Sequence, residues 1–136
     1  MLTRAMWIAG LTALAVAGAL AGVAQGVGFA YVQVSVPKTA VPSDRGFHLG
    51  FKGHSSKAVE LDMFVSTHAC RANAELETGL FREKKATRPV HHKVHGDFAH
   101  TLGYSVDKKG KHYACAYLYE VPKHPLARDD ASWQVT

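Results

Sequence analysis

Short runs in which apolar and polar residues alternate recur along most of this chain, and this period of two constrains the fold more than any other feature. Alternation places apolar side chains on one face of a β-strand and polar side chains on the other, so a second layer must cover the apolar face. Each run ends at residues typical of turns. We expect strands over residues 31–36, 46–51, 59–65, 90–98, 112–120 and 132–136.

Turn residues separate the expected strands. Pro42 with Ser43-Asp44, the stretch Gly53–Lys57 and the stretch Asp107–Gly110 all have turn chemistry. The segment Cys70–Thr78 favours helix over strand and predicts a short helical or irregular stretch that ends near Gly79. The chain has no internal repeat and no long amphipathic helix. These features predict an all-β fold, a β-sandwich of about seven short strands.

The N-terminal residues have the layout of a signal peptide. Met1–Ala5 carries one positive charge, Met6–Val23 is uncharged and apolar, and small residues follow. The apolar stretch is 18 residues long, enough to span a bilayer of ~30 Å, so an uncleaved signal-anchor helix is the alternative. Membrane contact is expected only through that uncleaved segment. The expected organisation is a signal peptide or signal anchor at 1–24, a linker at 25–30 and a β-sandwich domain at 31–136.

Export gives the cysteines a specific meaning. An exported domain folds in an oxidising extracytoplasmic compartment, where paired cysteines form disulfides. Cys70 and Cys115 are the only cysteines, so one pairing is possible. Closing that loop stabilises the fold by about 4 kcal/mol. We expect this disulfide in a secreted or cell-envelope protein, and two buried free thiols are the alternative.

The stretch around the second cysteine resembles a known motif. Tyr113 lies two residues before Cys115, as in the tyrosine corner of immunoglobulin-like sandwiches, and Cys70 follows the third expected strand. On these residues the chain resembles the immunoglobulin-like β-sandwich modules of exported bacterial proteins. It departs from antibody-type domains, because their first cysteine lies on the second strand and Val59–Val65 here lacks the core Trp. The resemblance implies a binding, adhesive or spacer module.

Basic residues concentrate in two segments that would form one patch if they meet in space. The net charge of +5 favours anionic partners. We expect an unknown protein, a carbohydrate or an anionic envelope polymer, and no nucleic acid, because aromatic residues that would stack bases are missing there. The ordinary alternative is a solvated face. The candidate binding patch comprises Lys84, Lys85, Arg88, Lys93, Lys108, Lys109 and Tyr119, the tyrosine that we expect to be exposed because it lies nearest its strand end.

Nine histidines raise the question of a metal site. Imidazole is a good ligand for zinc, copper or nickel. On a strand, however, His91 and His95 lie ~13 Å apart, too far to chelate one ion without a neighbouring strand. The expectation is therefore a solvated face without a metal. The alternative ligand set is His91, His95, Asp97 and His112.

Signatures of catalysis are missing from the sequence. It contains no G-x-S-x-G, Walker A or H-E-x-x-H motif. Both thiols are expected in the bridge, which removes them as nucleophiles. We expect a secreted or envelope-associated, non-enzymatic binding or adhesion module of unknown ligand, with no cofactor. The alternatives are an extracytoplasmic His-based metal-binding protein and, behind it, a small hydrolase without a recognisable motif.

Overall fold

A computed structural model describes residues 29–87 and 89–136. The leader expected at 1–24, most of the linker and Arg88 lie outside the described residues. The first strand begins at Ala30, so the last residue of the expected linker already belongs to the sheet. In the described part of the chain, no helix combines the length and the hydropathy needed to cross a membrane.

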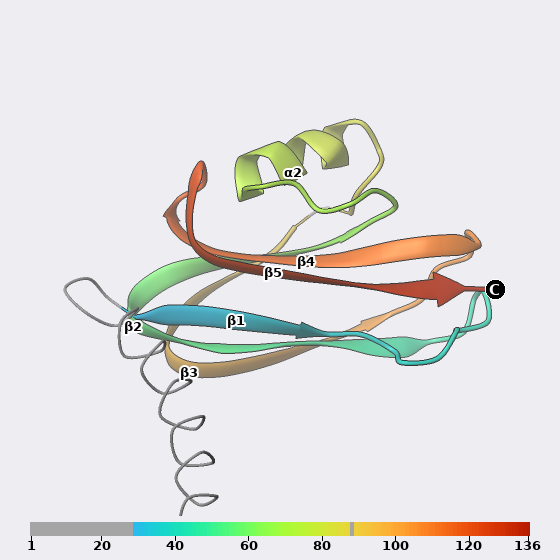
Figure 1. The fold of residues 1–136 in the computed structure, drawn as a ribbon, viewed down its shortest axis with the longest axis horizontal. Helices are drawn as coiled ribbons and strands as arrows, with labels where there is room; N and C mark the ends of the chain where they lie inside the picture. Colours follow the sequence, from blue (N-terminus) through green and yellow to red (C-terminus); the bar gives the residue numbers. More distant parts are fainter. Residues whose placement is uncertain (1–28, 88) are drawn as a thin grey trace, which may run out of the picture.

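The described residues form five strands in one antiparallel sheet and a single helix, instead of about seven strands (Figure 1). The expected strands at 46–51 and 59–65 are one continuous strand, and the turn expected at Gly53–Lys57 lies inside it. The elements are β1 (Ala30–Ser35), β2 (Phe47–Ser66), α2 (Ala74–Arg82), β3 (Val90–Tyr104), β4 (Gly110–Val121) and β5 (His124–Val135).

The long strand β2 belongs to both layers of the fold. Its first part pairs with β1 and β3, its second part pairs with β3 and β4, and β4 pairs with β5. The β2–β3 register shifts between Ser55 and Val59, near Gly96 with its φ of +74°. His92 and His100 would be ~26 Å apart on a straight strand, yet their ring centroids are 4.1 Å apart. The irregularity therefore bends the β2–β3 ribbon and folds the sheet into two layers.

The main core lies between the two layers. Leu49, Phe51 and Leu61 are fully buried on β2, and Trp133 faces them from β5. At the open side, β1 approaches β5, and the Val34 amide donates to the Asp129 carboxylate at 2.7 Å. Beyond β1, Val41 pairs with the end of β5, where its amide donates to the Gln134 carbonyl at 2.9 Å. These bonds hold the layers together where no strand is shared.

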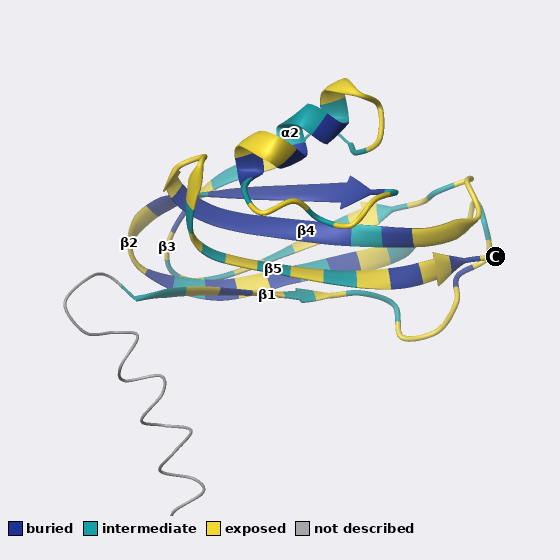
Figure 2. Cartoon of the chain, turned by 45° about the horizontal axis from the view of Figure 1, so that its top comes forward, coloured by how far each residue is buried: buried dark blue, intermediate teal, exposed yellow. Residues whose placement is uncertain are grey.

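Strand β4 is buried on both faces because α2 covers its outer side (Figure 2). Asn73 caps α2 through a 2.9 Å bond from the Leu76 amide to its side chain. Cys115 and Tyr117 point to this outer cluster and away from the core between the layers. Side chains along β4 therefore alternate between this outer cluster and the core between the layers, and both faces of the strand are buried.

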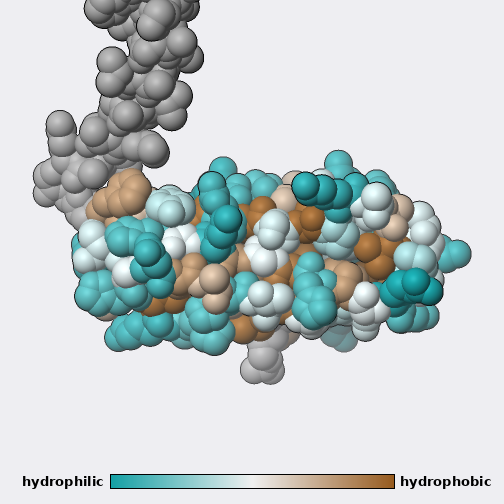
Figure 3. Space-filling model, turned by 90° about the horizontal axis from the view of Figure 1, so that it is seen from below, coloured by the Kyte–Doolittle hydropathy of each residue, from teal (hydrophilic) through white to brown (hydrophobic). Residues whose placement is uncertain are grey.

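The opposite face of the molecule, formed by the layer of β1, is open to solvent. Figure 3 shows it as mostly hydrophilic, with apolar atoms in small separate areas. Tyr31 is the main exposed aromatic residue there, and its ring packs against Phe29 at a centroid distance of 5.6 Å. Phe29 and Tyr31, with Val32 and Gln33, line a shallow pocket of ≈ 450 Å³ on this face.

Candidate functional site

Helix α2 ends in a turn that fixes two of the candidate lysines. The Lys84 amide donates to the Phe81 carbonyl at 2.9 Å, and the Lys85 amide donates to the Leu80 carbonyl at 2.8 Å. This is the Schellman pattern, in which the residue after the cap is left-handed and usually glycine. Here Lys84 takes that position with a φ of +62°. Lys84 therefore adopts a left-handed backbone conformation that costs free energy for lysine and would cost none for glycine.

The loop after the helix is bound to the end of β2. The Lys85 carbonyl accepts hydrogen bonds from the Thr67 amide at 3.0 Å and from the Ser66 hydroxyl at 3.1 Å. Thr87 is also tied to Val65, with its amide donating at 2.8 Å and its hydroxyl accepting at 3.0 Å. These bonds fix the two lysines of the loop relative to the sheet.

A pocket of ≈ 180 Å³ lies between this loop and the β3–β4 connection. Its apolar walls are Val65 at the end of β2, Ala86 in the loop and Val106 in the β3–β4 connection. The polar residues that line it are Ser66, Thr67, Lys84, Lys85, Lys108, His112 and the part-buried Thr87 and Tyr104. We call this the basic pocket.

The basic pocket carries positive charge and one unused ring nitrogen. Lys85 makes an exposed ion pair with Glu83 at 3.2 Å, whereas Lys84 and Lys108 make none with any described residue. His112 is 2% exposed; its Nδ1 lies 3.2 Å from the Gly110 carbonyl, and its Nε2 has no hydrogen-bond partner. An unsatisfied buried polar atom of this kind is costly.

The structure therefore brings the two basic segments together, but only in part. Lys84, Lys85 and Lys108 line one pocket. Lys93 lies on β3 opposite Glu60, away from it, and Lys109 does not line it. The seventh candidate, Arg88, lies outside the described residues. The place of His112 in the pocket could not be predicted, because no sequence pattern shows which loops meet in space.

The expectation that Tyr119 is exposed is wrong. Tyr119 is 7% exposed, and its hydroxyl donates to the buried Asp62 at 2.8 Å. On the other side of that carboxylate, His91 Nδ1 donates to Asp62 at 2.5 Å, and His91 Nε2 pairs with Glu60 at 2.7 Å. The hydrogen bond to Asp62 is the main cause that raises the pKa of His91. The network thus favours a charged His91 and holds Tyr119 inside the protein.

The alternative metal set does not converge. His91 binds two carboxylates, His95 Nε2 lies 3.3 Å from the Ser56 carbonyl, and Asp97 pairs with His54 at 2.7 Å. His112 lines the basic pocket, and its ring packs against Trp133. Within the described ranges, the four side chains form no common group of ligand atoms, so the His-based site is not supported. His91 pairs in register with Asp62, whereas His95 lies at the register shift between β2 and β3.

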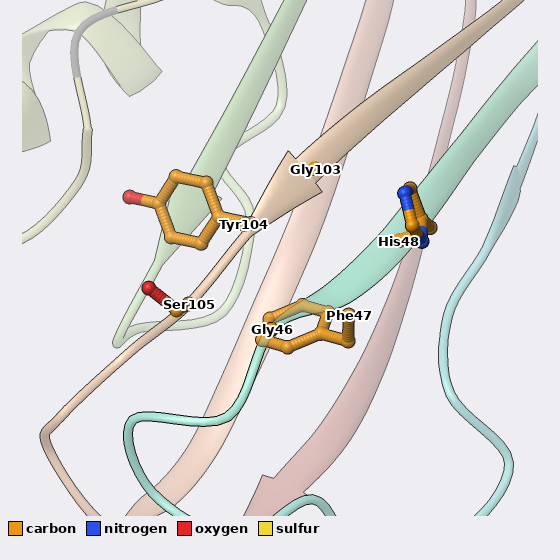
Figure 4. Close-up of a pocket in the computed structure, with 6 residues that line it drawn as sticks. All are labelled: Gly46, Phe47, His48, Gly103, Tyr104 and Ser105. Carbon is orange, nitrogen blue, oxygen red and sulfur yellow. The ribbon is translucent and has the colours of Figure 1, made fainter.

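A second, larger depression of ≈ 660 Å³ lies where β2 begins and β3 ends (Figure 4). Tyr104 and Ser105 lie on one side of the β3 end, and His48 lies on the other. In the described part of the chain, no hydrogen bond joins His48 to Ser105.

The expected cysteine pair is bonded. Cys70, in the loop before α2, forms a disulfide with Cys115 on β4, and their Cα atoms are 5.8 Å apart. Cys115 is fully buried, whereas Cys70 is partly exposed. The bridge ties the connection that carries α2 to the centre of the sheet, so it supports the helix whose end forms the basic pocket.

Comparison with known proteins supports the fold class. No protein-family model matches the chain, and no curated protein matches its sequence. A CARDB domain from Pyrococcus furiosus, crystallised in complex with di-metal ions, is similar in structure with a TM-score of 0.51 and 8% identity. The match covers 82% of this chain and 90% of that chain. With its all-β structure, this chain has an immunoglobulin-like β fold, and at this identity the likeness shows the fold alone.

Proposed function

We propose that the protein is an exported, non-enzymatic binding module that holds an acidic carbohydrate in the basic pocket. The observation that carries the proposal is the convergence of Lys84, Lys85 and Lys108 from two connections beside His112. Lysines attract the carboxylate or sulfate of such a ligand. The pocket is smaller than the ~300–1,000 Å³ of drug-sized sites, so one sugar unit or chain end of a polymer occupies it.

His112 supports a sugar over a simple anion. Because its Nδ1 faces the Gly110 carbonyl, Nδ1 carries the proton in the neutral ring, and the partnerless Nε2 is then an acceptor. An acceptor beside lysines suits a ligand that has both acidic oxygens and hydroxyl groups. Acidic sugars of envelope polymers have both.

The disulfide and the immunoglobulin-like fold support an extracytoplasmic location, because disulfides persist in oxidising compartments. In this proposal the protein is secreted or held at the cell envelope. Its surface lysines then meet polymers that carry carboxylate groups, and attraction to them weakens as salt screens the charges.

The first test is a triple substitution, Lys84→Gln, Lys85→Gln and Lys108→Gln. We expect binding of an oligogalacturonate to weaken by about tenfold or more, because charge-assisted hydrogen bonds are lost. Calorimetry at low salt measures the affinity. A neutral malto-oligosaccharide of equal length should not bind.

The matched control removes three exposed lysines elsewhere, Lys38→Gln, Lys52→Gln and Lys93→Gln. Its net charge equals that of the triple variant. If the control loses as much affinity as the pocket variant, the protein binds through its net charge, and the basic pocket is not the site.

Lys84→Gly separates binding from stability. Glycine relieves the left-handed strain but adds freedom to the unfolded chain, so the free energy of unfolding should rise by no more than about 1 kcal/mol. Binding of the same oligogalacturonate should weaken severalfold because one cation is gone. Urea unfolding and calorimetry measure the two effects. Unchanged affinity would show that Lys84 does not contact the ligand.

A further inference from the structure

A fully buried carboxyl group lies against the disulfide under helix α2. Glu77 is 0% exposed, and its carboxylate oxygen and the sulfur atoms of Cys70 and Cys115 all lie within 4.8 Å of one another. Within the described residues this is the one group of three side chains with metal-ligand chemistry at such spacing. It lies on the outer side of β4, apart from the basic pocket.

Only one of the two Glu77 oxygens is satisfied. Oε1 accepts from the Arg71 amide at 2.8 Å and from the Tyr117 hydroxyl at 3.1 Å. Oε2 is buried and has no hydrogen-bond partner. The bonds to Oε1 hold the carboxyl group in place, as the outer partners of metal ligands do. Oε2 is therefore the carboxylate oxygen that these hydrogen bonds leave unused.

We propose that, when the disulfide is reduced, Cys70, Cys115 and Glu77 form a site for a thiophilic divalent cation such as zinc. In tetrahedral zinc sites, bonds of about 2.3 Å to sulfur and about 2.0 Å to oxygen place the ligand atoms ~3.5–3.8 Å apart. The three side chains already lie within reach of that spacing once the S–S bond is broken. The partly exposed Cys70 leaves solvent access for a water as the fourth ligand.

The reaction needs an external dithiol. The dithiol gives two electrons and two protons to the bridge, the S–S bond breaks, two cysteine thiols form, and the dithiol becomes a disulfide. The cation then displaces the two thiol protons and binds both thiolates. In this way the metal takes over the link between the α2 loop and β4 that the disulfide makes in the oxidised protein.

Burial explains why the site prefers a cation. Glu77 is 0% exposed, and a bound dication would compensate the charge of a carboxylate buried to this degree.

Cadmium is a suitable probe, because thiolate-to-cadmium charge transfer is visible in the ultraviolet. The full chain is reduced with a phosphine and titrated with Cd²⁺. We expect the reduced protein to bind one Cd²⁺ per chain and to show the charge-transfer band. The oxidised protein should not show this band. Glu77→Gln should weaken binding by about tenfold or more, since it replaces a charged ligand with a neutral amide.

The matched control is Glu75→Gln. Glu75 lies on the same helix but is exposed, with only a distant pair to Lys123 at 3.9 Å. This variant should bind Cd²⁺ as tightly as the parent protein. Equal affinities of the two glutamine variants would overturn the proposal, because cysteines of an unfolded chain bind metal without Glu77.

Circular dichroism and thermal unfolding keep the test decisive if reduction loosens the fold. Cd²⁺ should raise the unfolding temperature of the reduced parent and of Glu75→Gln more than that of Glu77→Gln. If the reduced parent loses its β signal and Cd²⁺ does not restore it, the site does not form and the proposal fails.

Discussion

Removing the disulfide with Cys70→Ala and Cys115→Ala lowers the free energy of unfolding by about 4 kcal/mol, the value expected from loop closure over a separation of 45 residues. The bridge is the only covalent tie on the outer side of β4, where α2 and Tyr117 pack. Urea unfolding of the parent and the double variant measures the difference.

Dithiothreitol provides the control for this prediction. It should destabilise the parent to a similar extent and leave the double variant unchanged. A loss well below ~1 kcal/mol in the double variant would mean that the bridge adds little to a fold held by packing alone. Small domains have a net stability of about 5–15 kcal/mol, so the variant should stay folded in water.

Among the described glycines, Gly53 is the one whose substitution by alanine should lower the stability most. An added Cβ would lie 2.0 Å from the Tyr31 carbonyl oxygen and 2.8 Å from the Phe98 ring. The backbone of β1 cannot move away without losing its pairing with β2. We expect the free energy of unfolding to fall by about 3 kcal/mol.

Gly46→Ala is the matched substitution, because nothing lies within 4 Å of its added Cβ. Its stability should change by no more than ~1 kcal/mol. Hydrogen exchange gives a second measurement, since β1 amides should lose protection in Gly53→Ala alone. Equal stability of the two variants would show that β1 does not pack this closely against β2 at Gly53.

The sequence predicts the strands better than it predicts their number. The alternation at 46–51 and 59–65 correctly marks strand residues, and Gly53–Lys57 between them looks like a chain reversal. In the structure those residues continue the strand through a register shift. Glycine and serine permit both a turn and a bulge, and the pairing of this segment with β1 and β3 decides between them.

The position of Tyr119 shows a second limit. A period of two identifies two faces of a strand, but it does not tell whether a helix covers the second face. Because α2 packs on β4, Tyr117 and Tyr119 are buried on the face opposite Leu118, which is also buried. Local sequence around β4 contains no signal for that contact, which depends on a helix about 40 residues earlier.

The sequence predicts part of the basic pocket. Lys84, Lys85 and Lys108 are recognisable as members of two basic segments, which form one patch only if they meet in space. The role of His112 was not recognisable, since burial of a single histidine follows from tertiary packing against Trp133. The sequence shows which residues are basic, but only the fold shows which of them lie together in one pocket.

The bend of the β2–β3 ribbon makes the two ends of the sandwich unequal. At one end both strands pass from layer to layer without a loop, and the β4–β5 hairpin lies beside them (Figure 1). At the other end lie the connections from β1 to β2 and from β3 to β4, with the basic pocket. A change in loop length or sequence can therefore alter the surface at the end that carries the basic pocket, while at the other end β2 and β3 must keep their register for both layers at once.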